Sequence, residues 1–210
     1  KNIKKFFGKP IICYSIQLAL KSGLFNKIHV STESKKIKNI VEKFGLKIDF
    51  LRNKKLSTNR VKLIDVFRHV VKKFKLLGES FDQIWFMSSC APLLSEKDLI
   101  KASKLFLKKN VTSFIAVGEF AAPIQQGFKI DKRNKLKSLY PNKLNSRTQD
   151  LEKYYFDAGQ FGGFRTAELF KKKINFSAFI IDKDKSIDVD ELSDWKLMQI
   201  LYKCKKYNEK

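Results

Sequence analysis

Histidine, cysteine, glycine and proline are all scarce in this chain of 210 residues. It has two histidines, three cysteines, nine glycines and four prolines. Neither His29 nor His69 has a second metal ligand at zinc-site spacing, which argues against a zinc centre. The cysteines are odd in number and far apart, which argues against a disulfide framework and indicates a reducing compartment.

Long hydrophobic runs and the common fingerprints of catalysis are also missing. No apolar run approaches the ~20 residues that a membrane span requires, and no secretory signal pattern is present. The chain has no P-loop, no Gly-x-Gly-x-x-Gly fingerprint, no Gly-x-Ser-x-Gly elbow, no internal repeat and no low-complexity linker. With 43% hydrophobic residues it can build one sizeable core. We expect a cytoplasmic protein with one domain, residues 1–210, and no membrane partner.

Negative charge is scarce relative to positive charge. The chain has 44 Lys and Arg against 21 Asp and Glu, a formal net charge of +23. Such a balance raises a nucleic acid or an anionic surface as a partner. The lysines are, however, spread along the whole chain together with many Ile, Phe and Asn, as in a genome rich in A and T. We interpret the charge as solvated surface that attracts anionic small molecules, and a nucleic-acid partner as the weaker interpretation.

An alternation of helix and strand patterns fills the chain. Helical periodicity predicts helices over residues 10–21, 34–44, 61–77, 95–109, 166–172 and 191–202. Apolar and β-branched runs predict strands over residues 27–32, 47–52, 83–89, 112–120 and 177–182. Together they predict an α/β fold of three αβα layers around a mostly parallel sheet. Such a sheet binds its ligands at the carboxyl ends of its strands.

The alternation breaks over residues 121–157. This span contains Pro123 and Pro141, few long apolar periods, and one short strand pattern that leads into a turn at Asp131. An excursion of this length inside a compact domain is usually functional or an interface.

An acidic stretch, residues 186–195, stands out in so basic a chain. Residues i and i+2 of an extended strand point to the same face, so Asp188 and Asp190 would project together. Two carboxylates without a nearby His or Cys suit Mg²⁺, which leaves its other positions to water and substrate phosphates. The alternative is a strand-to-helix turn in which Ser193 or Asp190 caps the helix. On these residues alone the turn is the preferred interpretation.

Two more polar stretches carry candidate ligand-binding groups. In the simplest interpretation residues 145–151 are a hydrophilic loop, and residues 157–164 are a strand softened by glycine next to a turn. In the sharper interpretation, Arg147 and Gln149 are donors suited to carboxylate and amide groups.

Seven segments, spread over the whole chain, resemble in order and spacing the cytidylyltransferases that activate nonulosonic (sialic-type) acids. They are Lys1-Asn2-Ile3, Gly8-Lys9-Pro10-Ile11, Val30-Ser31-Thr32, Pro123-Ile124-Gln125, residues 145–151, residues 157–161, and Ile187-Asp188-Val189-Asp190 with Asp194-Trp195. The segments at 147–151 and 157–161 look most like the pseudaminic acid branch of that family.

The resemblance implies a Rossmann-like nucleotidyltransferase. In its reaction the anomeric hydroxyl of a nonulosonic acid, pseudaminic acid in this branch, attacks the α-phosphate of CTP. CMP-sugar for surface glycan or flagellin glycosylation and pyrophosphate are the products. The resemblance also implies a Mg²⁺ cofactor held by Asp188 and Asp190, with Arg147 as a further catalytic residue.

The same resemblance implies further binding residues and a partner. The nucleotide-binding residues would be Lys1, Asn2, Arg52 and Asn59. The sugar-binding residues would be Gln125, Arg147, Gln149, Asp157, Gln160 and Phe161. Residues 121–157 resemble the arm through which family members form homodimers, so that a partner chain would complete the sugar pocket.

The chain also departs from the family pattern in its nucleotide half. Family members have a strand and an Ala-Arg-x-Gly-Ser-Lys loop immediately before the Lys-Asn-Ile segment that opens this sequence. Asn59, Lys62 and Leu63 stand where the family has an Asp followed by small or Thr residues, and residues 88–90 replace a Pro-Thr pair. We expect residues 1–210 alone to be inactive or nearly so. The alternative is a catalytically decayed paralogue that binds nucleotide-sugars or serves as a dimerisation partner.

Overall fold

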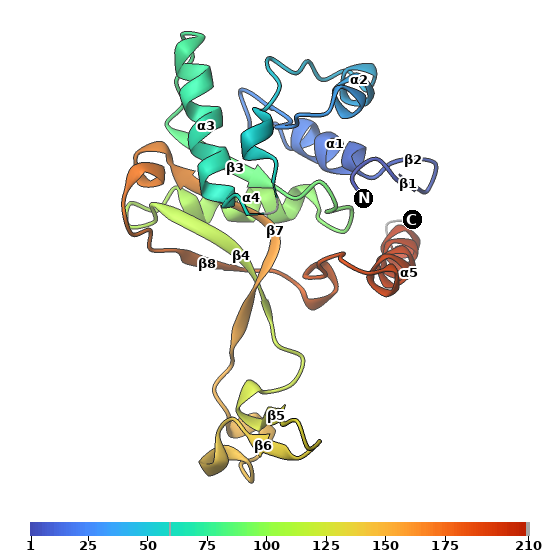
Figure 1. Cartoon of the computed structure of the whole chain (residues 1–210), viewed down its shortest axis with the longest axis vertical. Helices are drawn as coiled ribbons and strands as arrows, with labels where there is room; N and C mark the ends of the chain where they lie inside the picture. The colour runs from blue at the N-terminus through green and yellow to red at the C-terminus, as the bar shows by residue number, and fades with distance from the viewer. Residues whose placement is uncertain (59, 209–210) are drawn as a thin grey trace.

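A four-stranded mixed sheet lies at the centre of the computed structural model, which describes residues 1–58 and 60–208 (Figure 1). The strand order is β3 (Gln83–Met87), β7 (Tyr155–Arg165), β4 (Ser113–Glu119) and β8 (Ser177–Ile180). β4 and β8 pair in parallel, and β7 runs antiparallel to both of its neighbours. β3, β4 and β8 therefore share one direction, and their carboxyl ends lie at the same edge of the sheet.

Helices cover both faces of this sheet. α4 (Glu96–Phe106) covers one face, where Phe106 packs against the rings of β3 and β4. α3 (Leu63–Leu76) covers the other, where Phe67 stacks on Phe86 of β3 with 5.0 Å between ring centroids. The predicted α/β fold with three layers is confirmed. The prediction of a mostly parallel sheet is wrong, because β7 is inserted antiparallel between β3 and β4 and only β4 and β8 pair in parallel.

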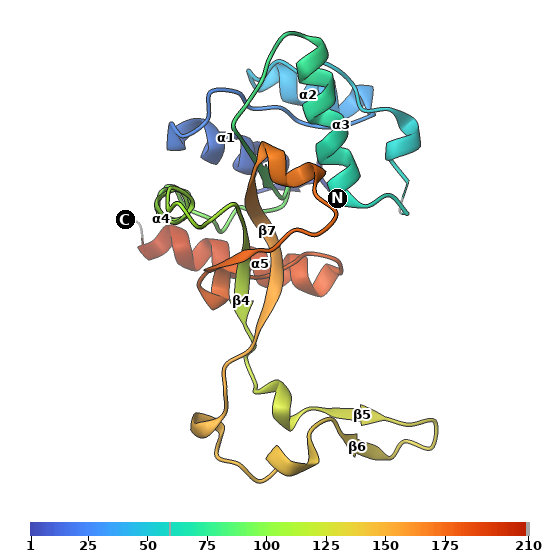
Figure 2. The same ribbon diagram turned by 90° about the vertical axis from the view of Figure 1, so that its left-hand side faces the viewer.

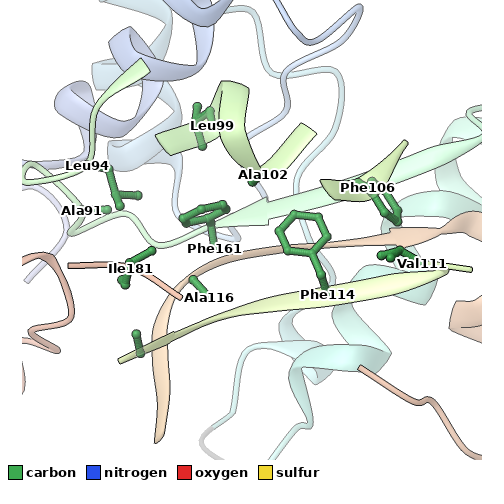
Figure 3. Packing of buried hydrophobic residues seen from close by; sticks show 11 residues of the cluster. Ala91, Leu94, Leu99, Ala102, Phe106, Val111, Phe114, Ala116, Phe161 and Ile181 are labelled. Atoms are coloured by element: carbon green, nitrogen blue, oxygen red, sulfur yellow. The ribbon is translucent and has the colours of Figure 1, made fainter. Parts of the chain in front are cut away.

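The largest buried cluster lies between α4 and the sheet (Figure 3). Phe114 and Phe161 are 0% and 1% exposed, and the Trp85 ring packs against both. Gly163 makes this packing possible, because a Cβ there would lie 2.6 Å from the Phe114 ring and 3.3 Å from the indole nitrogen of Trp85. Burying an aromatic side chain in this way contributes roughly 1.5–3 kcal/mol.

The predicted helix ends at the start of the chain are confirmed. α1 (Ile12–Ser22) ends at Gly23, whose φ of 64° is the left-handed conformation that glycine adopts most easily. α2 (Lys35–Lys43) begins after Ser34, whose hydroxyl oxygen accepts the backbone N–H of Ile37. At the other end of the chain, α5 (Leu192–Asn208) extends beyond the predicted helix, and residues 166–172 form a short 3-10 helix, Thr166–Phe170, instead of an α-helix.

The predicted strands over residues 27–32 and 47–52 are wrong. The two segments lie side by side, and the Arg52 N–H donates to the Thr32 carbonyl at 2.8 Å, but neither segment is a strand. Their rings pack instead, with 4.4 Å between the centroids of His29 and Phe50 and with Phe74 of α3 against both. Strand propensity reflects how well side chains pack on a pleated sheet. It does not show whether a partner strand is available to pair with the segment.

Residues 120–154, which we call the arm, project away from the sheet beyond the ends of β4 and β7 (Figures 1 and 2). The arm contains the antiparallel hairpin of β5 (Phe128–Ile130) and β6 (Leu136–Ser138) and several short 3-10 turns. A second small hairpin, β1 (Lys5–Phe6) and β2 (Lys9–Pro10), precedes α1. Within the described part of the chain, no helix combines the length and apolar character that a membrane crossing requires.

Candidate active site

The acidic stretch lies where the chain passes from β8 to α5. Asp188 and Asp190 are exposed, whereas Val189 between them is 3% exposed and packs in a cluster with Trp195 and Met198. Because alternate residues of an extended segment face opposite sides, burial of Val189 turns both carboxylates toward solvent.

Asp194 holds the start of α5. Its Oδ2 accepts the backbone N–H groups of Glu191 at 2.8 Å and Asp190 at 3.0 Å, and these bonds lower the pKa of Asp194. The prediction that Ser193 or Asp190 caps this helix is therefore wrong. The two N–H groups belong to the residues just before Leu192, the first residue of α5, so Asp194 binds the entry to the helix from within its first turn.

A bulge in β7 meets the acidic stretch. The β4–β7 pairing shifts register between Ile115 and Val117, and Gly159 within the extra β7 segment has a φ of +62°. Its N–H donates to Asp157 Oδ1 at 2.9 Å, and a Cβ on Gly159 would lie 3.6 Å from Asp188 Oδ2. The bulge thus brings the carboxylates of Asp157 and Asp188 close to the same glycine.

Lys1 places a positive charge beside the pair. Its ammonium donates to the Val189 carbonyl and lies 3.4 Å from Asp190 Oδ1. The Asp190 side chain is 79% exposed, so this ion pair adds little to stability. The ion pair is instead informative about the site, because it shows a cationic group beside the Asp190 carboxylate.

Asn2 contacts a different group, the thiol of Cys90. The Cys90 Sγ lies 3.9 Å from Asn2 Oδ1, and burial raises the pKa of this thiol. Cys90 therefore stays a neutral packing group at neutral pH.

Arg52 is held by two side chains that sequence reasoning did not assign. Its Nη2 donates to Glu33 Oε2 at 2.9 Å, and its Nε donates to the Ser57 hydroxyl at 3.1 Å. Glu33 and Arg52 end two neighbouring extended segments, and their opposite charges were the available signal. Asn59, the other predicted nucleotide-binding residue of this region, lies outside the described residues.

Three predicted sugar-binding residues belong to the arm. Arg147 and Gln149 are exposed, and both views show the arm projecting away from the sheet (Figures 1 and 2). Gln125 is 5% exposed, and its Nε2 donates to the Glu152 carbonyl at 2.7 Å, while its buried Oε1 has no hydrogen-bond partner among the described residues.

Two predicted sugar-binding side chains are buried. The assignment of Phe161 to a sugar pocket is wrong, because its ring packs in the core between α4 and the sheet. Gln160 is 3% exposed, and its Nε2 donates to the carbonyls of Ala158 at 3.2 Å and Ile187 at 2.8 Å. The amide of Gln160 is thus not a donor to a sugar here, and it ties the β7 bulge to the acidic stretch.

The donor set fits one kind of metal ion. Among residues 1–58 and 60–208, no three His, Cys, Asp or Glu side chains form a group that could hold a metal by themselves. Asp188 and Asp190 offer two carboxylates on one side of the chain. Mg²⁺ accepts such a partial set because it keeps water and substrate phosphates as its other ligands.

The fold of this chain, three layers around a mixed sheet, is shared with a solved protein structure. The structure resembles that of a CMP:2-keto-3-deoxy-manno-octonic acid synthetase solved with CTP, at a TM-score of 0.71 over 98% of this chain and 92% of that chain. The two chains are 15% identical, so this likeness concerns the fold alone.

Sequence comparison identifies the family, a family of nucleotidyltransferases. A profile described as cytidylyltransferase matches residues 1–207. The pseudaminic acid cytidylyltransferase of Campylobacter jejuni is 33% identical over 208 residues, which cover 97% of this chain and 89% of that protein. The CMP-N,N'-diacetyllegionaminic acid synthase of Legionella pneumophila is 26% identical over 212 residues, which cover 96% of this chain and 88% of that protein. The chain belongs to the cytidylyltransferase family, and the resemblance found in its segments is confirmed.

Proposed function

We propose that this protein transfers CMP from CTP to pseudaminic acid and releases pyrophosphate. The observation that carries the proposal is the exposed pair Asp188 and Asp190, which lies beside the β7 bulge in a chain of this family. Higher identity to the pseudaminic acid enzyme, 33% against 26% for the legionaminic acid enzyme, supports the choice of sugar.

In this proposal Asp188 and Asp190 hold Mg²⁺, which supplies positive charge to offset the charge that develops on the phosphates. Lys1 orients Asp190 from one side. Asp157 has one oxygen bonded to the Gly159 N–H, and its second oxygen would accept a hydroxyl of the sugar. Glu33 and Ser57 hold the Arg52 guanidinium for contact with the nucleotide.

We further propose that the arm completes the sugar pocket of a second copy. Ile130 and Leu136 on the arm hairpin are 67% and 65% exposed, and a homodimer would cover them. The same contact would bring Arg147 to the acidic stretch of the partner. The Oε1 of Gln125, which has no hydrogen-bond partner in the described part of the chain, fits an acceptor that becomes satisfied when substrate or water enters this region.

The test is pyrophosphate release from CTP with Mg²⁺ and pseudaminic acid. It measures turnover in the 210-residue chain and in the same chain extended by a family-type Ala-Arg-x-Gly-Ser-Lys loop. Asp188→Ala and Asp190→Ala should each reduce turnover by about 10²-fold or more, because the charge on the phosphates loses its counterion. Asp184→Ala, an equal loss of charge at another exposed position nearby, should stay within about 2-fold of the unsubstituted chain.

Legionaminic and N-acetylneuraminic acids serve as alternative substrates in the same assay. Turnover of one of them but not of pseudaminic acid would contradict the choice of sugar and keep the reaction. A folded, extended chain that turns over none of the three would contradict the reaction itself and favour the decayed paralogue.

A further inference from the structure

A cationic groove of about 1060 Å³ lies between α1, the C-terminal part of α5 and the loop that leads into α4. We call it the lysine groove and define it by its six lysines: Lys9, Lys21, Lys97, Lys203, Lys205 and Lys206. One acidic residue, Glu96, is among the described residues that line it. Tyr202 in its wall lies ten residues beyond Leu192, about 15 Å along α5, so the groove is distinct from the acidic stretch.

The wall of the groove is aromatic and well packed. Phe7 stacks on Tyr202 with 5.2 Å between ring centroids, and Tyr14 meets Tyr202 edge to face at 5.4 Å. The Tyr14 hydroxyl donates to the Phe6 carbonyl at 2.8 Å, which fixes the ring. The groove is therefore formed before any partner arrives.

Ammonium groups cover the faces of these rings. Lys9 Nζ lies 4.2 Å from the centroid of Tyr14, Lys206 Nζ 5.9 Å from that of Tyr202, and Lys203 Nζ 6.0 Å from that of Phe7. Cation–π attraction holds the charges at the wall of the groove and leaves these ring faces occupied.

The positive charges in the groove repel one another. Burial lowers the pKa of Lys9, and the charges of Lys21 and Lys206 lower it further. Lys205 donates to the carbonyls of Leu94 at 2.7 Å and Leu93 at 3.2 Å, which hold its charge beside the groove. An anionic occupant would relieve this repulsion.

We propose that the lysine groove docks an acidic polypeptide segment of a partner protein. Carboxylates along an extended segment can meet lysines of the groove, and apolar side chains between them can contact the edges of the Phe7 and Tyr202 rings, whose faces are occupied. A second copy of this chain is a poor occupant, because its 44 basic residues outnumber its 21 acidic ones.

Single-stranded nucleic acid fits the groove less well. Binding of that kind uses open aromatic faces on which bases stack, and here lysines cover those faces. The described lining residues also include no arginine, the residue that forms bidentate bonds to phosphate. A membrane surface is a poorer match still, because the lysines line a concave groove between helices.

Fluorescence anisotropy of a labelled peptide of repeated Glu-Glu-Leu units, titrated with the full chain, tests this proposal. Lys203→Glu combined with Lys206→Glu should weaken binding by about 10-fold or more, and the same pair changed to Gln should weaken it less. The matched control changes Lys35 and Lys36 of α2 to Glu, which alters the net charge equally and should have an effect of less than about 2-fold. Circular dichroism verifies that each variant is folded.

Three outcomes would overturn the proposal. The first is absence of peptide binding at low salt. The second is an equal loss in the groove and control pairs, which would mean that only the net charge matters. The third is tighter binding of labelled oligothymidylate or of anionic vesicles than of the peptide, lost in the same groove variants, which would assign the groove to that other partner.

Discussion

The sheet and the arm bury their apolar side chains to very different extents. In the sheet, Phe114 and Phe161 are 0% and 1% exposed beneath α4. In the arm, Ile130 and Leu136 pair across a hairpin of three-residue strands and remain 67% and 65% exposed. A two-stranded hairpin this short is not stable by itself in water. The sheet buries its core within one chain, whereas the arm has the surface of an element that packs against another molecule.

The proposed site is divided in the same way. Asp157, Asp188 and Asp190 belong to the body that carries the sheet, while Arg147 and Gln149 belong to the arm. If one chain held a complete site, the arm would have to fold back on its own body. Packing of the arm against a second chain would therefore stabilise the arm and complete the site at the same time.

The largest expected effect is the loss of stability when an apolar side chain is removed from the sheet and not from the arm. Phe114→Ala should lower the free energy of unfolding by about 3–5 kcal/mol, because it leaves a cavity in the core. Leu136→Ala should lower it by less than about 1 kcal/mol in the monomer, since the side chain is mostly exposed. Urea denaturation at low protein concentration measures both. Equal losses would show that the arm packs on its own body.

The next effect tests the bulge that joins Asp157 to Asp188. Gly159→Ala should cost about 1–2 kcal/mol, because its φ of +62° strains any residue with a Cβ. Gly23→Ala is the control: it has a φ of +64° and open space around it, and it should cost a similar amount. CMP transfer should fall with Gly159→Ala and not with Gly23→Ala. A similar loss of activity in both variants would contradict a special role for the bulge.

The smallest expected effect is the pH dependence of stability. It concerns the body of the protein, because neither histidine lies in the arm. Burial lowers the pKa of His29 below its usual 6.5. As pH falls below about 6.5 the unfolded chain takes up a proton that the folded chain resists, so stability decreases, by at most about 1.4 kcal/mol per pH unit. Above that pH both states are neutral and the effect vanishes.

Urea midpoints measured across this pH range test the assignment. His29→Gln should flatten the dependence more than His69→Gln does, because the His29 side chain is 6% exposed whereas His69 is half-buried. If the urea midpoint of His29→Gln depended on pH as strongly as that of the unsubstituted chain, the assignment of the effect to His29 would be contradicted.

Local patterns predicted much of this fold. Gly23, Gly45 and Gly78 follow three predicted helices, and all three adopt positive φ where those helices end. The solvent-facing alternation of Asp188 and Asp190 is also local, because it depends on one buried residue between them. Such features need only a few neighbouring residues.

Features that depend on distant partners could not be predicted in this way. Residues 27–32 have strand composition, but the ladder that would make them a strand is absent from the described residues. The burial of Gln160 and Phe161 follows from the register shift between β4 and β7, which no local pattern reveals. The capping role of Asp194 was local and still missed, because Ser193 and Asp190 satisfied the same pattern.

The most direct measurement of the divided site mixes two inactive variants. Chains carrying Asp188→Ala and chains carrying Arg147→Ala, both with the family-type loop, are unfolded together, refolded and assayed for CMP transfer. If the arm of one copy completes the site of the other, activity should return to roughly a quarter of that of the unsubstituted protein, because half of the dimers are mixed and each holds one intact site. Activity no higher than that of the separate variants, in a mixture verified to contain mixed dimers, would contradict the divided site.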